Sequence, residues 1–170
     1  PLRNLGKGSG NTATFDMSAG GTNRLAAGSS VAASGGKFIY TGGTDRDILG
    51  FGADAAKEGQ MSIDLGDDSS IDEITFAGLV GANTPDAALN SVSISNFKAD
   101  DTITLQAYTH NEITFTPYAN NTLVTAPSGL AFTVSGLTPN QVEAINDNGS
   151  AQIRVVGAGS SAGTSAFFSL

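Results

Sequence analysis

Apolar and polar residues alternate over short stretches along most of the chain. A period of two turns one side of an extended segment towards a core and the other towards water, so it predicts β-strands. The clearest predicted strands are residues 38–40, 92–94, 102–105, 113–115, 123–124, 130–134 and 153–156. The pattern therefore predicts an all-β fold, either a β-sandwich or a short β-solenoid.

Two short segments depart from the alternation and predict helices. Residues 84–89 begin with Thr-Pro, which suits an N-cap followed by proline at the first helical position. Thr138 and Gln141 have the spacing of a capping box, and the apolar residues among 142–145 would continue that helix. The expected fold thus contains one or two short helices beside its strands.

An internal repeat is the strongest pattern in the sequence. The motif Ile-x-x-Phe-x-Ala-Asp begins at Ile48 and again at Ile94. Each copy is followed by an Ile-x-Leu stretch and then by Glu-Ile-Thr-Phe, at Glu73 and at Glu112. A weaker third copy aligns Val134 with Ile94. The sequence therefore predicts two to three repeated β modules, in which Glu73 and Glu112 hold equivalent positions.

The two ends of the chain differ from its middle. Residues 1–36 are polar and rich in Gly and Ser, with a weak strand signal near 12–17, and they are interpreted as a flexible or assembly-ordered N-terminal arm. Residues 37–156 form the predicted β-repeat domain. Residues 157–170 are interpreted as a small-residue linker followed by an apolar tail.

Composition narrows the classes of function. The 170 residues carry a formal net charge of −8, which would repel nucleic acid. The chain has no Cys and a single His, His110, so disulfides, thiolate metal sites and sites with two His ligands are excluded. No apolar run is long enough to suggest membrane insertion. His110 fits a surface turn, and no motif predicts an enzyme.

The acidic residues are clustered, and they predict a calcium site. Ca²⁺ takes six to eight oxygen ligands, which clustered carboxylates and the carbonyls of Gly-rich turns can supply. The candidate ligands of the main cluster are Asp45, Asp47, Asp54, Asp64, Asp67, Asp68 and Asp72, and those of a smaller cluster are Asp100 and Asp101. The alternative is that these carboxylates lie in solvated turns, where Asp is common.

The repeat motif with its following Ile-x-Leu strand resembles the region after the calcium repeats of haemolysin-type (repeats-in-toxin) proteins. Residues 42–48, Gly-Gly-Thr-Asp-Arg-Asp-Ile, resemble a degenerate glycine-aspartate nonapeptide of that family. Residues 167–170 are similar to the end of an uncleaved type I secretion signal. The likeness covers roughly residues 38–170 and lacks the tandem nonapeptide array. It implies export from the bacterium and dependence on calcium.

These observations predict a secreted, non-catalytic structural protein at the bacterial cell surface or in the matrix. Surface-layer, fibre and adhesin subunits belong to this class. The expected partners are copies of the chain itself, as in a homo-oligomer, and cell-surface polysaccharide. The alternative is a virion structural protein such as a capsid decoration, spike or tail subunit. A third possibility, a soluble enzyme or carbohydrate-binding module, would need a pocket of converging polar groups.

Overall fold

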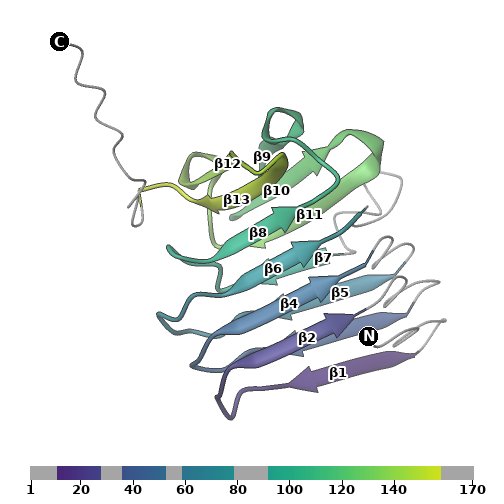
Figure 1. Ribbon diagram of the computed structural model, residues 1–170, viewed down its shortest axis with the longest axis vertical. Helices are drawn as coiled ribbons and strands as arrows, with labels where there is room; N and C mark the ends of the chain where they lie inside the picture. The colour runs from purple at the N-terminus through teal and green to yellow at the C-terminus, as the bar shows by residue number, and fades with distance from the viewer. Residues whose placement is uncertain (1–10, 28–35, 53–58, 79–91, 158–170) are drawn as a thin grey trace.

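The computed structural model describes residues 11–27, 36–52, 59–78 and 92–157. These residues form two facing β-sheets, and the prediction of an all-β fold is confirmed. Figure 1 shows the two sheets stacked front to back, with the N-terminal strands at the bottom. No helix within the described ranges has the length and apolar character needed to cross a membrane.

The larger sheet has seven strands, and the smaller has six. The larger contains, in spatial order, β1 (Thr12–Asp16), β3 (Lys37–Thr41), β5 (Gln60–Asp64), β7 (Val92–Ser95), β11 (Leu130–Ser135), β10 (Asn121–Ala126) and β9 (Thr114–Tyr118). The smaller contains β12 (Val142–Asp147), β13 (Ser150–Val155), β8 (Thr102–Leu105), β6 (Glu73–Phe76), β4 (Asp47–Phe51) and β2 (Asn23–Ala27).

From β1 to β8, consecutive strands alternate between the two sheets, and neighbours within each sheet are parallel. The chain therefore winds through four turns of a coil, and each turn adds one strand to each of the two sheets. We call residues 12–105 the coil. From β3 to β8, each strand buries every second side chain between the sheets, as the alternation in the sequence predicts.

Aromatic rings line the core of the coil. Phe15 contacts Phe38, Phe38 contacts Phe51 and Phe51 stacks on Phe76, with centroid distances of 5.5, 5.5 and 5.2 Å. Phe76 then contacts Phe132 of β11 at 6.2 Å. The column of rings thus links the first three turns of the coil to β11.

The chain from β9 to β13 folds by a different rule, and we call residues 114–155 the antiparallel cap. Antiparallel pairing joins β9 to β10, β10 to β11, and β12 to β13. β11 runs parallel to β7 and β13 antiparallel to β8, so one part of the cap extends each sheet. Val134 pairs with Ile94, which agrees with the alignment of these two residues in the sequence.

The equivalence of the two Ile-x-x-Phe-x-Ala-Asp copies is wrong. Ile48 lies in β4 of the smaller sheet, and Ile94 lies in β7 of the larger one. Glu73 begins β6, but Glu112 ends a short 3-10 helix, His110–Glu112. Strands of both sheets bury alternate apolar residues, so similar sequences arise at positions that are not equivalent in the fold.

The helix predicted over 142–145 is also wrong. The capping box of Thr138 and Gln141 exists, but it encloses only the 3-10 helix Pro139–Gln141. β12 begins at Val142 because β13 offers its backbone as a hydrogen-bonding partner. The other predicted helix, over 84–89, lies outside the described residues.

The proposed N-terminal arm contributes strands to the fold. β1 and β2 lie within residues 1–36, and they pair in parallel with β3 and β4. Residues 1–10 and 28–35 of this arm, together with 158–170 of the C-terminal segment, lie outside the described residues.

Candidate functional site

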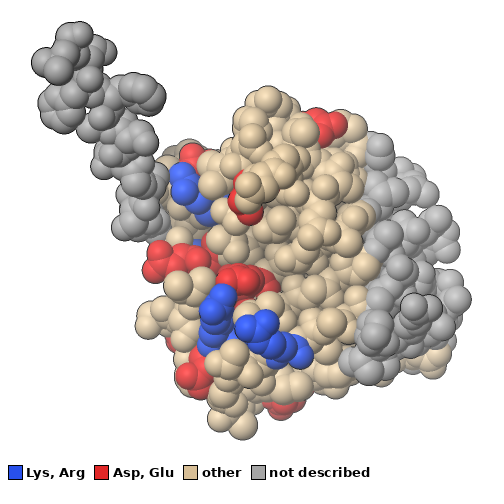
Figure 2. Space-filling view, in the orientation of Figure 1, with Lys and Arg blue, Asp and Glu red and all other residues tan. Residues whose placement is uncertain are grey.

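Charged side chains gather on one side of the molecule, where the chain turns from the larger sheet to the smaller one (Figure 2). The turns after β3, β5 and β7 cover residues 42–46, 65–72 and 96–101. They contain most of the aspartates proposed as calcium ligands. Because the strands are in register, equivalent residues of successive turns lie next to one another.

Three of these aspartates, Asp47, Asp72 and Asp101, form a buried column, which we call the aspartate column. Each stands at or just before the first residue of a strand in the smaller sheet. Their side chains are 0%, 2% and 1% exposed. The sequence identified all three as acidic, but nothing in their local context predicted this burial.

Each carboxylate of the column accepts a hydrogen bond from the turn of chain beneath it. The backbone N–H of Asp47 donates to Asp72 Oδ1 at 2.7 Å, and that of Asp72 donates to Asp101 Oδ1 at 2.9 Å. The Asn23 side chain donates to Asp47 Oδ1 at 2.8 Å, and the Lys98 backbone N–H donates to Asp101 Oδ2 at 2.7 Å. The column therefore ties all four turns of the coil together.

Burial governs the ionisation of the column. It raises the pKa of Asp72 to about 7, and the charges of Asp101, Asp47 and Asp68 act in the same direction. Burial also raises the pKa of Asp101, again with a contribution from Asp68. Burial and the charge of Asp47 raise the pKa of the Tyr40 hydroxyl well above its usual range. Asp72 thus holds its proton to a higher pH than an exposed carboxylate would.

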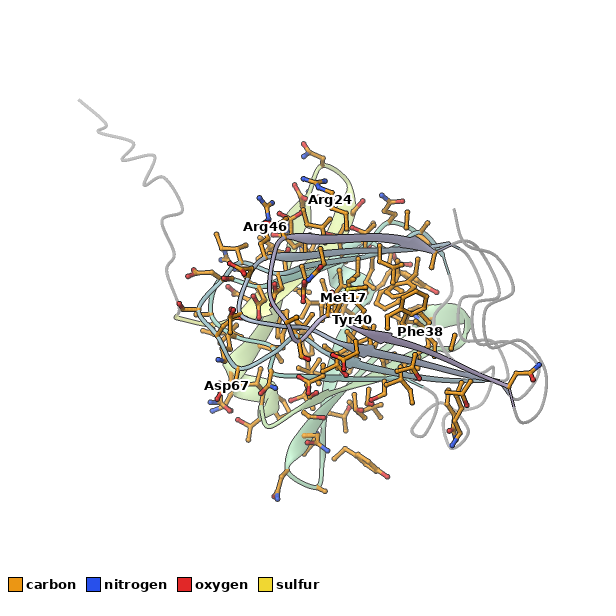
Figure 3. All side chains as sticks on the ribbon, turned by 90° about the horizontal axis from the view of Figure 1, so that it is seen from below. Met17, Arg24, Phe38, Tyr40, Arg46 and Asp67 are labelled. Atoms are coloured by element: carbon orange, nitrogen blue, oxygen red, sulfur yellow. The ribbon has the colours of Figure 1, made fainter. Side chains whose placement is uncertain are left out.

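Two buried carboxylate oxygens have no hydrogen-bond partner within the described residues, namely Asp47 Oδ2 in the column and Asp68 Oδ2 next to it. The Tyr40 hydroxyl shares this property, and Figure 3 shows Tyr40 between the two sheets. Asp47 Oδ2 packs against Gly42, where an added Cβ would collide with it and with the Leu65 carbonyl oxygen. Glycine is required here because backbone and carboxylate approach so closely.

Three further candidate ligands bond to neighbouring turns of the coil. Asp45 Oδ2 accepts from the Gly21 N–H at 2.6 Å. Asp64 Oδ1 accepts from the Asn96 side chain at 2.7 Å. Asp67 forms an ion pair with Lys98 at 2.6 Å, which lowers the pKa of Asp67. Each of these carboxylates therefore links two turns through a proton donor.

The structure does not gather the nine proposed ligands into one centre. Asp54 lies outside the described residues. Among the residues that are described, no three acidic or His side chains converge in a way that would hold a metal ion. Asp68 is close enough to Asp72 and Asp101 to influence their ionisation, whereas Asp100 is exposed. Asn23 and Tyr40 lie next to Asp47, and Lys98 bonds to Asp67 and Asp101. No sequence motif predicted a role for these three residues.

The N-terminal end of the coil carries a second candidate site, formed by the edges of β1 and β2. Lys37 N–H donates to Asn11 O, and Met17 N–H donates to Thr41 O, so odd-numbered residues of β1 bond to β3. The backbone groups of alternate residues point to opposite neighbours. Those of Thr12, Thr14 and Asp16 consequently face away from the sheet.

The odd-numbered residues of β2 likewise direct their backbone groups to β4. Asn23 N–H donates to Arg46 O, and Ala27 O accepts from Gly52 N–H. Arg24 and Ala26 therefore turn their backbone groups to the open side, and no described strand pairs with them. Figure 3 looks onto this end of the molecule, and it shows Arg24 outside the β2 ribbon. We call the unpaired edges of β1 and β2 the open end.

Searches against family models, curated proteins and solved structures return no match for this chain. The class of the protein therefore follows from its fold: an all-β protein of two facing, parallel-rich sheets with a buried aspartate column.

Proposed function

We propose that this chain is a non-catalytic structural protein of the bacterial exterior that assembles with copies of itself. The open end carries the proposal. Two neighbouring strand edges there present rows of backbone donors and acceptors, and such edges readily pair with another chain. No described strand covers these edges, as expected for a protein that uses them for assembly.

The other end of the stack supports this reading by contrast. Its outermost strands are β9 and β12. Pro117 lies within β9, and proline in an edge strand removes a backbone donor that a second chain would need. Proline thus blocks one edge of the cap, whereas neither β1 nor β2 contains a proline.

Two pockets among the described residues are small for a small-molecule site. One pocket of about 220 Å³ is lined by residues of β3, β5 and β7, and another of about 140 Å³ lies beside Asp68 and Lys98. Both are smaller than the roughly 300–1,000 Å³ usual for small-molecule sites. Flat sheet surfaces with sparse charge favour subunit packing instead, in a surface layer, a fibre or an adhesin.

Export by type I secretion and stabilisation by calcium belong to the same proposal, and they rest on the resemblance to haemolysin-type proteins. The crowded carboxylates of the turns support the calcium part, since an external divalent cation would relieve their mutual repulsion. Cell-surface polysaccharide is the proposed second partner.

Electron microscopy of the purified protein, with calcium and with a chelator, tests the proposal. Ordered polymers are expected with calcium, because calcium would bridge the acidic turns of neighbouring copies and add a second contact to that of the open end. Monodisperse monomers in both conditions would contradict self-assembly. Replacing Asp64, Asp67 and Asp68 with Asn tests the metal separately. The triple variant should lose assembly or thermal stability relative to the parent protein only when calcium is present, and an equal loss in chelator would refute calcium binding.

A further inference from the structure

The open end is complementary to itself. Resting on the proposed self-assembly, we infer that it binds the open end of a second copy in a two-fold dimer, in which β1 of each copy pairs antiparallel with β2 of the other. The larger sheet of each copy then continues into the smaller sheet of the other copy.

The fold fixes the register of this pairing. Phe38 and Phe51 contact each other across the core, so they lie at the same level along the strands. Ala13 of β1 pairs with Phe38, and Ala27 of β2 pairs with Phe51. Ala13 and Ala27 therefore share one level, and residues further along the two strands share the following levels. A two-fold rotation about the strand direction preserves these levels and exchanges the two sheets.

In this register, the residues with outward backbone groups face one another. Asp16 stands opposite Arg24 of the second copy, and Thr14 stands opposite Ala26 of the second copy. All four side chains are exposed on the outer faces of the sheets. The backbone donors and acceptors of each pair meet as in an ordinary antiparallel ladder, and Asp16 and Arg24 bring opposite charges together twice.

The inward residues match as well. Phe15 stands opposite Leu25 of the second copy, and both are partly buried side chains packed against the end of the core. Pairing covers them on their remaining open side, so that the apolar core runs through the dimer. Apolar burial and backbone pairing then favour the same arrangement.

The competing two-fold arrangement pairs β1 with β1 and β2 with β2. In that arrangement, Thr14 faces Thr14 of the second copy, and Asp16 faces Thr12 of the second copy, so no opposite charges meet. Charge complementarity therefore selects the exchange of sheets between the copies.

Disulfide trapping distinguishes these arrangements, since the native chain contains no Cys. In a hydrogen-bonded antiparallel pair, Cα atoms lie about 5.5 Å apart, which suits a disulfide. The variants Thr14→Cys and Ala26→Cys should cross-link when mixed under mild oxidation, and neither should cross-link alone. Cross-linking of Thr14→Cys alone would overturn the inferred pairing in favour of the competing arrangement.

Sedimentation velocity of the parent protein and of the proline variants Thr14→Pro and Ala26→Pro completes the test. Each proline removes an outward N–H that no described residue of the monomer accepts, so loss of the dimer is expected, while Thr14→Val, which keeps the N–H, should dimerise like the parent. Circular dichroism checks that each variant folds. A parent protein that associates without cross-linking would overturn this dimer but not self-assembly, and a parent that stays monomeric at every concentration would overturn both.

Discussion

The strands of the coil and those of the antiparallel cap find their pairing partners in different ways. In the coil, every strand finds its partners one full turn away, so equivalent residues stack into columns of Phe and Asp. In the cap, partners come from adjacent hairpins, and cross-strand pairs such as Glu143 and Arg154 replace the columns. A parallel coil leaves unpaired backbone groups at an end strand unless another strand continues the sheet. Here the hairpins of the cap continue both sheets at one end, and no described strand does so beyond β1 and β2.

The largest effect is expected at the junction between the two regions. Phe76 is fully buried, and its ring contacts Phe51 of the coil and Phe132 of the cap. Phe76→Ala should lower the free energy of unfolding by about 3 to 5 kcal/mol, since it leaves a cavity between them. Chemical denaturation measures this loss. Ile71→Ala, at a residue that is 49% exposed, is the control and should change stability little. A tolerated Phe76→Ala would mean that coil and cap unfold independently.

Alanine substitutions at two glycines with similar backbone angles distinguish the cost of disturbing the stacked turns from the cost of local backbone strain. Gly66 in the coil and Gly149 in the cap have φ angles of 88° and 90°. A Cβ at Gly66 would collide with the Gly43 carbonyl of the preceding turn, whereas a Cβ at Gly149 would meet nothing within 4 Å.

Both alanine substitutions carry the left-handed strain of roughly 1 to 2 kcal/mol. Gly66→Ala should cost about 1 to 3 kcal/mol more, because neighbouring turns must also move apart. Thermal or urea denaturation of the two variants gives the difference directly. Equal losses would show that the turns of the coil are not tightly stacked.

The aspartate column should make the stability of the coil depend on pH. The pKa of Asp72 is about 7 in the folded protein, against an ordinary value of 3.8. The folded chain therefore binds a proton that the unfolded chain has lost, so stability should fall as pH rises from about 4 to about 7. Asp72→Asn should flatten this dependence in denaturation curves.

Asp72→Ala also removes the acceptor of the buried Asp47 N–H and should cost about 1 to 3 kcal/mol at pH 5, where Asp72→Asn costs less. Glu112, next to the cap, is the contrast. Hydrogen bonds from Thr109 lower its pKa, so its small contribution is lost as pH falls. A slope unchanged by Asp72→Asn would contradict the role of the column.

The smallest effects are expected at the surface ion pairs. Arg46 pairs with Glu73 in the coil, and Arg154 pairs with Glu143 in the cap at 2.8 Å. All four side chains are substantially exposed, so Glu73→Gln and Glu143→Gln should each change the free energy of unfolding by less than about 1 kcal/mol. A larger loss at Glu73 alone would mean that links between turns of the coil depend on charge.

The all-β class, most of the strands and the acidic character of the turns could be predicted from the sequence. Alternation fixes these features because each strand must bury one face, whichever sheet it joins. It also determined that Val134 aligns with Ile94, which are direct neighbours in the larger sheet.

The assignment of each strand to one of the two sheets depends on tertiary contacts. Two identical motifs, at Ile48 and at Ile94, lie in different sheets because burial of alternate residues does not record the identity of the neighbouring strand. The same holds for Val142, where a partner strand overrode a helical signal. Asp47, Asp72 and Asp101 became a buried column, and Asp45 and Asp67 remained in exposed turns, since the register between successive turns of the chain sets burial and a single segment cannot encode it.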